Sequence, residues 1–111
     1  MRLPIIVSES GNLNFYRTLE YAQIDIEPID VQNAEYVIYD ADGFLLVPRV
    51  VHERRVEVVQ IIPTPEIRKA ELKELLTNFF SEVGHERTVL ETMDLAQLVE
   101  IGKAYVKDRH R

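Results

Sequence analysis

Hydrophobic and polar residues follow two different patterns along the chain, and the change between them falls near residue 63. Before it, short β-branched and aromatic runs separated by turn residues predict strands. After it, apolar residues recur every three or four positions, as in amphipathic helices. We therefore expect a single α+β domain over residues 1–111, strand-rich over 1–62 and helical over 64–108. Strands followed by helices favour an antiparallel sheet of about five strands with the C-terminal helices packed on one face.

The clearest turn is Asp40-Ala41-Asp42-Gly43, which lies between two apolar runs. Aspartate tolerates turn geometry and Gly43 can adopt a positive φ, so the segment predicts a hairpin. Pro48 lacks a backbone N–H and should lie at a bulge or at the sheet edge. The full set of expected strands is 3–8, 13–16, 35–39, 44–47 and 54–62, with a connection over 29–34 that tucks Ile29 and Val31 inward.

The strongest helical pattern covers residues 65–83, where six apolar residues step by three and one. Thr64 is expected to cap this helix, with proline at its first position. Gly84 is expected to end it, because glycine takes the left-handed conformation that closes a last turn.

Three shorter helices are also expected. The first covers 18–26 and should begin at Thr18, whose hydroxyl can accept from a free backbone N–H. Thr88 with Glu91 and Asp94 with Gln97 match the capping-box pattern and predict helices over 88–92 and 94–107. Gly102 lies on the apolar stripe of the last helix, where it would allow a neighbouring backbone to approach closely.

Composition narrows the class of protein. Apolar residues make up 46% of the chain and charged residues 29%, as in ordinary globular domains. The chain has no cysteine, which excludes disulfides, a thiol nucleophile and thiolate metal ligands. No apolar run approaches the roughly 20 residues that cross a bilayer. We expect a cytoplasmic protein of bacterial type, without a membrane partner or a cofactor.

The net charge of −6 is unevenly distributed. Residues 1–48 are strongly acidic, which disfavours nucleic acid as a partner because a phosphate backbone needs clustered cations. The stretch 49–69 is basic, and its candidate contact residues for an anion or an acidic partner are Arg49, His52, Arg54 and Arg55. The alternative interpretation is a solvated, charged edge strand that discourages aggregation.

The segment around Asp40 also raises an enzymatic hypothesis. An apolar strand running into Asp40-Ala41-Asp42-Gly43 resembles the nucleophile motif of haloacid-dehalogenase-type phosphatases, in which the first carboxylate attacks phosphorus, the second is an acid/base and Mg²⁺ neutralises both. Phe44 departs from that pattern, no later acidic pair follows, and the chain continues into a strand. The hairpin turn is therefore the favoured interpretation.

Metal-site patterns are weak. His52-Glu53 begins like a zinc-peptidase signature, but Val56 stands where the second histidine is needed. His85 and His110 lie far from it in sequence, and the spacing around Asp40 does not fit a calcium loop. We expect no metal ligands and no catalytic residues.

Bulky apolar residues lie on both faces of the Asp40 hairpin. Tyr36, Tyr39 and Phe44 are the candidate interface residues. The C-terminal helices can cover only one face, so either the short N-terminal helix or a partner chain covers the other.

The segments Glu27-Pro28-Ile29-Asp30-Val31, Glu35-Tyr36 and Tyr39-Asp40-x-x-Gly43 resemble a group of small bacterial proteins of unknown function. The resemblance covers about residues 1–62. It implies a bacterial source and brings no activity, cofactor or catalytic residue with it.

Three hypotheses of function follow from the sequence. The leading one is a non-enzymatic protein-binding protein, either a homodimer or bound to another protein, for which an acidic immunity- or antitoxin-like role is one version. The alternatives are a small metal-dependent phosphatase centred on Asp40 and Asp42, and an anion-binding regulatory module that uses Arg49, Arg54 and Arg55.

Overall fold

The computed structural model describes residues 1–107, and its backbone forms a mixed α+β fold built on one six-stranded sheet. The strands are β1 (Ile5–Glu9), β2 (Asn12–Tyr16), β3 (Tyr36–Tyr39), β4 (Phe44–Glu53), β5 (Val56–Ile67) and β6 (Val106–Lys107). The helices are α1 (Leu19–Asp25), α2 (Pro28–Gln32), α3 (Lys69–Glu82), α4 (Arg87–Leu90) and α5 (Leu95–Gly102), followed by a 3₁₀ turn, η1 (Lys103–Tyr105).

The sheet has the strand order β5-β4-β3-β1-β2-β6 and is mostly antiparallel. The expected hairpins are present: β1 pairs with β2 around Ser10-Gly11, and β3 pairs with β4 around the Asp40 turn. Among the strands of residues 1–107, only β6 runs parallel to its neighbour, pairing Phe15 and Tyr16 with Val106 and Lys107. The predicted class is confirmed, with one strand more than expected at the C-terminal end.

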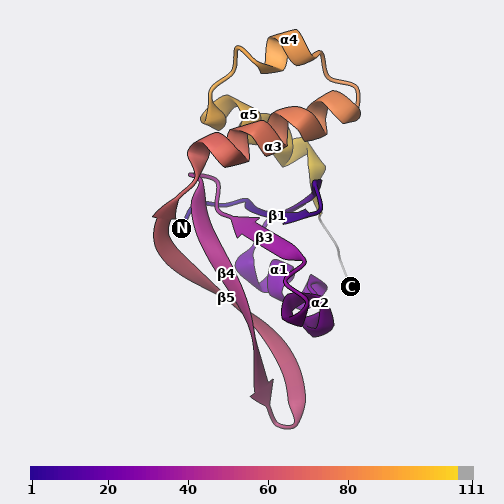
Figure 1. The fold of residues 1–111 in the computed structure, drawn as a ribbon, viewed down its shortest axis with the longest axis vertical. Coiled ribbons are helices and arrows are strands. Elements are labelled where there is room, and N and C mark those ends of the chain that lie inside the picture. Colours follow the sequence, from indigo (N-terminus) through magenta and orange to yellow (C-terminus); the bar gives the residue numbers. More distant parts are fainter. Residues whose placement is uncertain (108–111) are drawn as a thin grey trace.

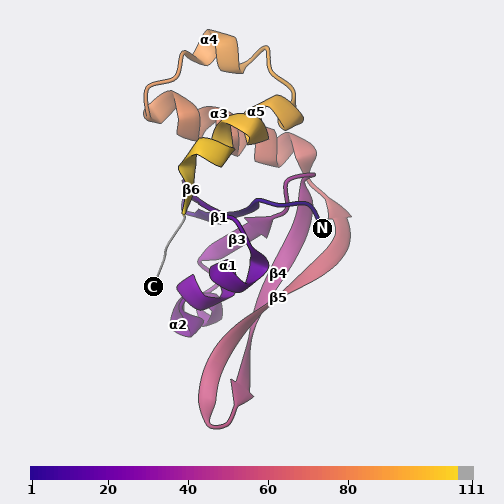
Figure 2. The same cartoon turned by 180° about the vertical axis from the view of Figure 1, so that it is seen from behind.

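Helices cover both faces of the sheet (Figures 1 and 2). On one face, α3, α4 and α5 bury a cluster around Phe15, Tyr39 and Phe80. On the other, α1 and α2 pack over a second cluster around Ile5, Ile38 and Ile61. Of the two alternatives for the second face, the chain's own N-terminal helix therefore supplies the cover over the centre of the sheet.

Two predicted helix starts are confirmed in atomic detail. Thr18 caps α1, because its Oγ1 accepts from the backbone N–H of Tyr21 at 3.1 Å. Asp94 and Gln97 form a complete capping box on α5. The helix expected over 88–92 is present as α4, but it begins at Arg87, and the Thr88 hydroxyl donates to Glu86 instead of capping.

The expectation that the long helix begins at residue 65 is wrong. The segment around Thr64 is the last part of β5, and α3 begins at Lys69. Two contacts hold this segment extended: the Thr64 hydroxyl donates to the Leu45 carbonyl at 2.7 Å, and the Arg68 N–H donates to the Gly43 carbonyl at 2.7 Å. The proline at position 65 fits because β5 is the edge strand of the sheet.

Two other boundaries differ from expectation. The segment 29–34 is not a simple connection, because Pro28 begins the short helix α2. Val31 packs inward against the second cluster as expected, but Ile29 is 56% exposed. The helix expected over 94–107 ends at Gly102, after which the chain turns and pairs as β6. Gly102 does permit a close approach, although the neighbour is the ring of Phe15 and not a backbone.

Candidate binding surface

The outer part of the β4–β5 hairpin, residues 47–62, projects from the body of the protein and is called the arm below (Figure 1). Its two strands pair in one unbroken register from Val47 opposite Ile62 to Glu53 opposite Val56. β-Branched residues make up eight of the 16 residues of the arm, which suits a pleated ribbon. Isolated two-stranded ribbons are marginally stable in water, so an arm of this length depends on what packs against it.

The turn at the tip of the arm consists of two arginines in the left-handed region. Arg54 has φ 49° and Arg55 has φ 67°. Two-residue turns of this kind favour Asn-Gly, because glycine has no Cβ and the short polar side chain of asparagine tolerates positive φ better than longer side chains do. The tip therefore carries two exposed cations at positions where smaller residues would be more stable, and strained positions of this sort gather at functional sites.

The arm has one covered face and one uncovered face. Val59 and Ile61 are buried in the cluster beneath α1 and α2. The side chains that alternate with them point the other way, and within residues 1–107 none of them belongs to either core cluster. Val56 is 59% exposed and Val47 is 44% exposed. The apolar residues of this uncovered face are Val47, Val51, Val56, Val58 and Ile62.

The outer edge of β5 is only partly closed. The Ile61 N–H donates to the Gln23 side chain of α1 at 2.9 Å and so points away from β4. Residues of an antiparallel strand alternate in the direction of their backbone groups. In the unbroken register of the arm, Glu57 and Val59 must therefore also direct their N–H and C=O groups outward. No partner for these groups is present among the described residues.

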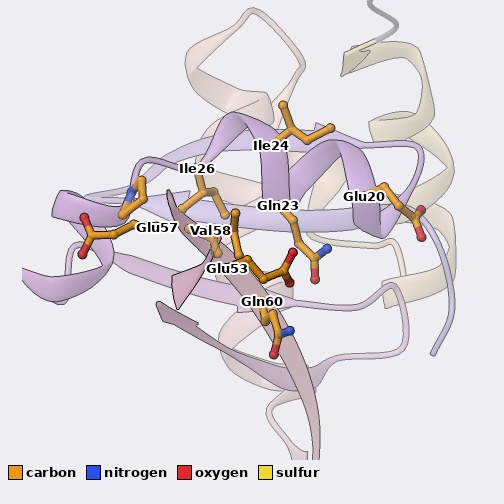
Figure 3. A pocket seen from close by; sticks show the side chains of 10 residues that line it. Glu20, Gln23, Ile24, Ile26, Glu53, Glu57, Val58 and Gln60 are labelled. Carbon is orange, nitrogen blue, oxygen red and sulfur yellow. The ribbon is translucent and has the colours of Figure 1, made fainter. Parts of the chain in front are cut away.

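A groove of 420 Å³ runs between this edge and α1 (Figure 3). Gln23 extends from α1 towards β5, at the point where it caps Ile61. The described side chains that line the groove include the carboxylates of Glu20, Glu53 and Glu57 and no lysine or arginine. The groove therefore combines an open strand edge with an excess of negative charge.

The four basic candidates lie on the arm but do not converge on one site. Arg49 donates to the Gln60 side chain at 3.1 Å across the two strands. His52 lies 3.5 Å from the Glu57 carboxylate, on the opposite face of the ribbon. Arg54 and Arg55 stand at the tip. An anion site formed by Arg49, Arg54 and Arg55 together thus gains no support from this arrangement.

The Asp40 carboxylate forms part of the turn. It is 2% exposed, and its Oδ1 accepts from the backbone N–H groups of Asp42 and Phe44 at 2.9 and 3.0 Å. Its Oδ2 accepts from the Arg2 N–H at 3.3 Å. Asp42 points elsewhere and pairs with the Arg2 guanidinium at 3.0 Å. Gly43 has the positive φ, 90°, that the turn requires.

The three aromatic candidates for an interface pack mainly within the chain. Tyr39 is 1% exposed and its hydroxyl donates to Glu71 on α3. Tyr36 is half-buried and donates to Asp30 on α2 at 3.0 Å. Phe44 is also half-buried, at the start of β4. Tyr39 therefore has no exposed surface to offer a partner, because α3 covers it.

The buried hydroxyl of Tyr39 should make the stability of the fold depend on pH in the alkaline range. Burial and the hydrogen bond to Glu71 raise the pKa of Tyr39 above its ordinary value of 10. The unfolded chain therefore loses this proton before the folded chain does, and stability is full below pH 10 and falls as pH rises above it. Urea denaturation at several pH values from 8 to beyond 10 should show this loss, and Tyr39→Phe should reduce the slope. An unchanged slope in the variant would contradict the assignment.

The histidines do not assemble a metal site within the described residues. His85 Nε2 lies 2.8 Å from the Tyr105 hydroxyl, beside the aromatic cluster of Phe80. His110 lies outside the described residues. The open backbone groups of β5 and the role of Gln23 were not identified from the sequence. The prolines at positions 63 and 65, which alternate along the strand, are a further sequence signal of an edge.

Comparisons with known proteins leave the family open. No family model matches the sequence, and neither the search of curated proteins nor the search of solved structures found a match. The resemblance to small bacterial proteins therefore stays a prediction. Within residues 1–107, no helix combines the length and apolar character needed to span a membrane.

Proposed function

We propose that this chain is a non-enzymatic protein-binding protein that makes its contact through the arm. The observation that carries the proposal is the uncovered apolar face at residues 47–62, where Val47, Val56 and Ile62 are exposed and no apolar side chain of the face belongs to a core cluster of the described chain. Exposed apolar surface of this kind is typical of sites that bind another protein. The strained arginines at the tip add a charged rim to that surface.

Charge supports a protein partner over nucleic acid. The chain carries a net charge of −6, and the basic stretch on the arm, from Arg49 to Arg55, is interrupted by Glu53 and followed by Glu57. An acidic protein of this size that meets a basic partner gains mainly in association rate. An immunity- or antitoxin-like protein in the bacterial cytoplasm is the version of the proposal that fits this charge.

The phosphatase alternative has little in the structure to support it. The Asp40 carboxylate that would attack phosphorus is occupied by three backbone N–H groups. A nucleophile held in this way has no free path to a substrate, because its oxygens face the turn that they close.

A site-specific photo-crosslinker tests the proposal in the native host. Placed at Val56 on the uncovered face, it should yield one dominant adduct of defined mass. Placed at Glu74, on the exposed surface of α3, it should yield only background. Equal adducts at both positions, or none at Val56, would refute a contact through the arm.

A further inference from the structure

We infer that the arm binds a second copy of this chain, with the two β5 edges pairing antiparallel across a two-fold axis. This inference rests on the proposed function and names its partner. The two copies would join their sheets edge to edge through Glu57 and Val59, and the arginines at each tip would enter the acidic groove of the other copy.

The pattern of blocked and open edge positions identifies where the pairing occurs. From Ile61 onward β5 is closed to another strand, because Gln23 occupies the Ile61 N–H and prolines 63 and 65 have no N–H to donate. Sheet edges in natural proteins are usually closed by such devices. Glu57 and Val59 are the two positions between the tip and this block whose backbone groups stay open.

Two-fold symmetry then fixes the register. If Glu57 of each copy faces Val59 of the other, every open N–H and C=O of these residues finds a partner, giving four hydrogen bonds. The axis passes beside Val58, so that Val58 faces the same residue of the second copy. A shift by one residue would place the outward-directed groups of one copy opposite inward-directed groups of the other and make none of these bonds.

The same register brings opposite charges together. Arg55 lies three residues before Val58 and Ile61 lies three residues after it, so Arg55 of one copy falls opposite Ile61 of the other. Ile61 is held by Gln23, and Glu20 lies one helical turn from Gln23 on α1. The tip of one arm therefore ends in the other copy's groove, beside the carboxylate of Glu20.

The pairing also accounts for the uncovered face and the strained tip. Val56 and Val58 of the two copies lie on the same face of the joined ribbon and form one apolar strip. The unfavourable φ of Arg54 and Arg55 is offset when their charges meet Glu20 of the other copy in a partly enclosed groove. The contact is the same patch on both copies, which closes the assembly at two.

The absence of cysteine allows a direct test of the register. Val58→Cys places two thiols opposite each other in a non-hydrogen-bonded pair, with Cβ atoms about 5 Å apart. Mild oxidation should convert most of this variant into a disulfide-linked dimer. Val56→Cys is the matched control on the same strand and face. Its two thiols would be about 13 Å apart, because they are separated by four residues of extended strand, and it should stay unlinked.

Two variants at one position test the backbone contacts. Glu57→Pro removes an outward N–H without touching the β4 ladder, and it should weaken self-association by about tenfold or more, since two symmetric bonds are lost. Glu57→Ala keeps the N–H and should dimerise. Light scattering of the wild-type chain should give a mass near twice 12.9 kDa. Glu20→Arg and Arg55→Glu should each weaken the dimer several-fold, and the two together should restore it.

The outcomes separate this inference from the proposed function. A monomer at every concentration, no disulfide at position 58, or equal disulfide yields at 58 and 56 would overturn the antiparallel dimer. If the crosslinker at Val56 then captured a different protein as its single adduct, the binding function would stand without the dimer. If it captured nothing, both would fall.

Discussion

Replacing Asp40 by alanine should lower the free energy of unfolding by about 3 kcal/mol, although within residues 1–107 only backbone N–H groups donate to this carboxylate. Its oxygens accept from the N–H groups of Arg2, Asp42 and Phe44 in a site that is closed to solvent. Alanine leaves these three donors without their acceptor, and the turn at Gly43 keeps only its backbone bonds, from the Gly43 N–H to the Asp40 carbonyl at 3.1 Å and from the Asp40 N–H to the Phe44 carbonyl at 3.0 Å. Chemical denaturation of the variant measures the loss.

Asp42→Ala is the matched control for this prediction. Asp42 lies two residues away in the same turn, but its carboxylate makes an exposed ion pair with Arg2. Such pairs contribute at most about 1 kcal/mol, so this variant should be close to the wild type. Asp40→Asn keeps one oxygen acceptor, so its loss in the free energy of unfolding should lie between those of Asp40→Ala and Asp42→Ala. Equal losses for Asp40→Ala and Asp42→Ala would show that the turn does not depend on the buried carboxylate.

The sequence predicted those parts of the fold that local chemistry determines. The Thr18 cap and the capping box at Asp94 were predictable because each depends on residues within one helical turn. The end of α3 was predictable for the same reason: Gly84 takes φ 108°, and the next N–H, of His85, returns to the Phe80 carbonyl. Glycine is the residue that tolerates this conformation.

The errors lie where distant contacts override local preference. Thr64 and the proline after it match a helix start, yet the Leu45 carbonyl takes the Thr64 hydroxyl and keeps the segment in the sheet. Nothing between residues 60 and 70 encodes that contact. The C-terminal strand is a similar case, because Val106 continues a helical stripe and becomes β6 only when Phe15 is beside it.

The candidate site was predicted in part. The basic run from Arg49 to Arg55 lies on the hairpin that carries the candidate surface, and its charge pattern was visible in the sequence. The uncovered face and the open edge were not, because both depend on where α1 ends up in relation to β5. Tyr39 was chosen from the sequence as an interface residue because it is aromatic, but α3 buries it. The exposed valines of the arm were not chosen.

Gly102→Ala should lower the free energy of unfolding by about 2 kcal/mol, even though alanine is the better helix former by about 1 kcal/mol. A Cβ at this position would lie 2.7 Å from Cε2 of Phe15, and Phe15 cannot retreat because it stacks on Phe80 with ring centroids 6.1 Å apart and contacts Phe79 at 5.8 Å. Thermal or urea denaturation measures directly whether the substitution lowers or raises the free energy of unfolding. Combining the substitution with Phe15→Leu should recover part of the loss in a double-mutant cycle. A stabilised Gly102→Ala variant would mean that helix propensity, and not the contact between α5 and β2, decides this position.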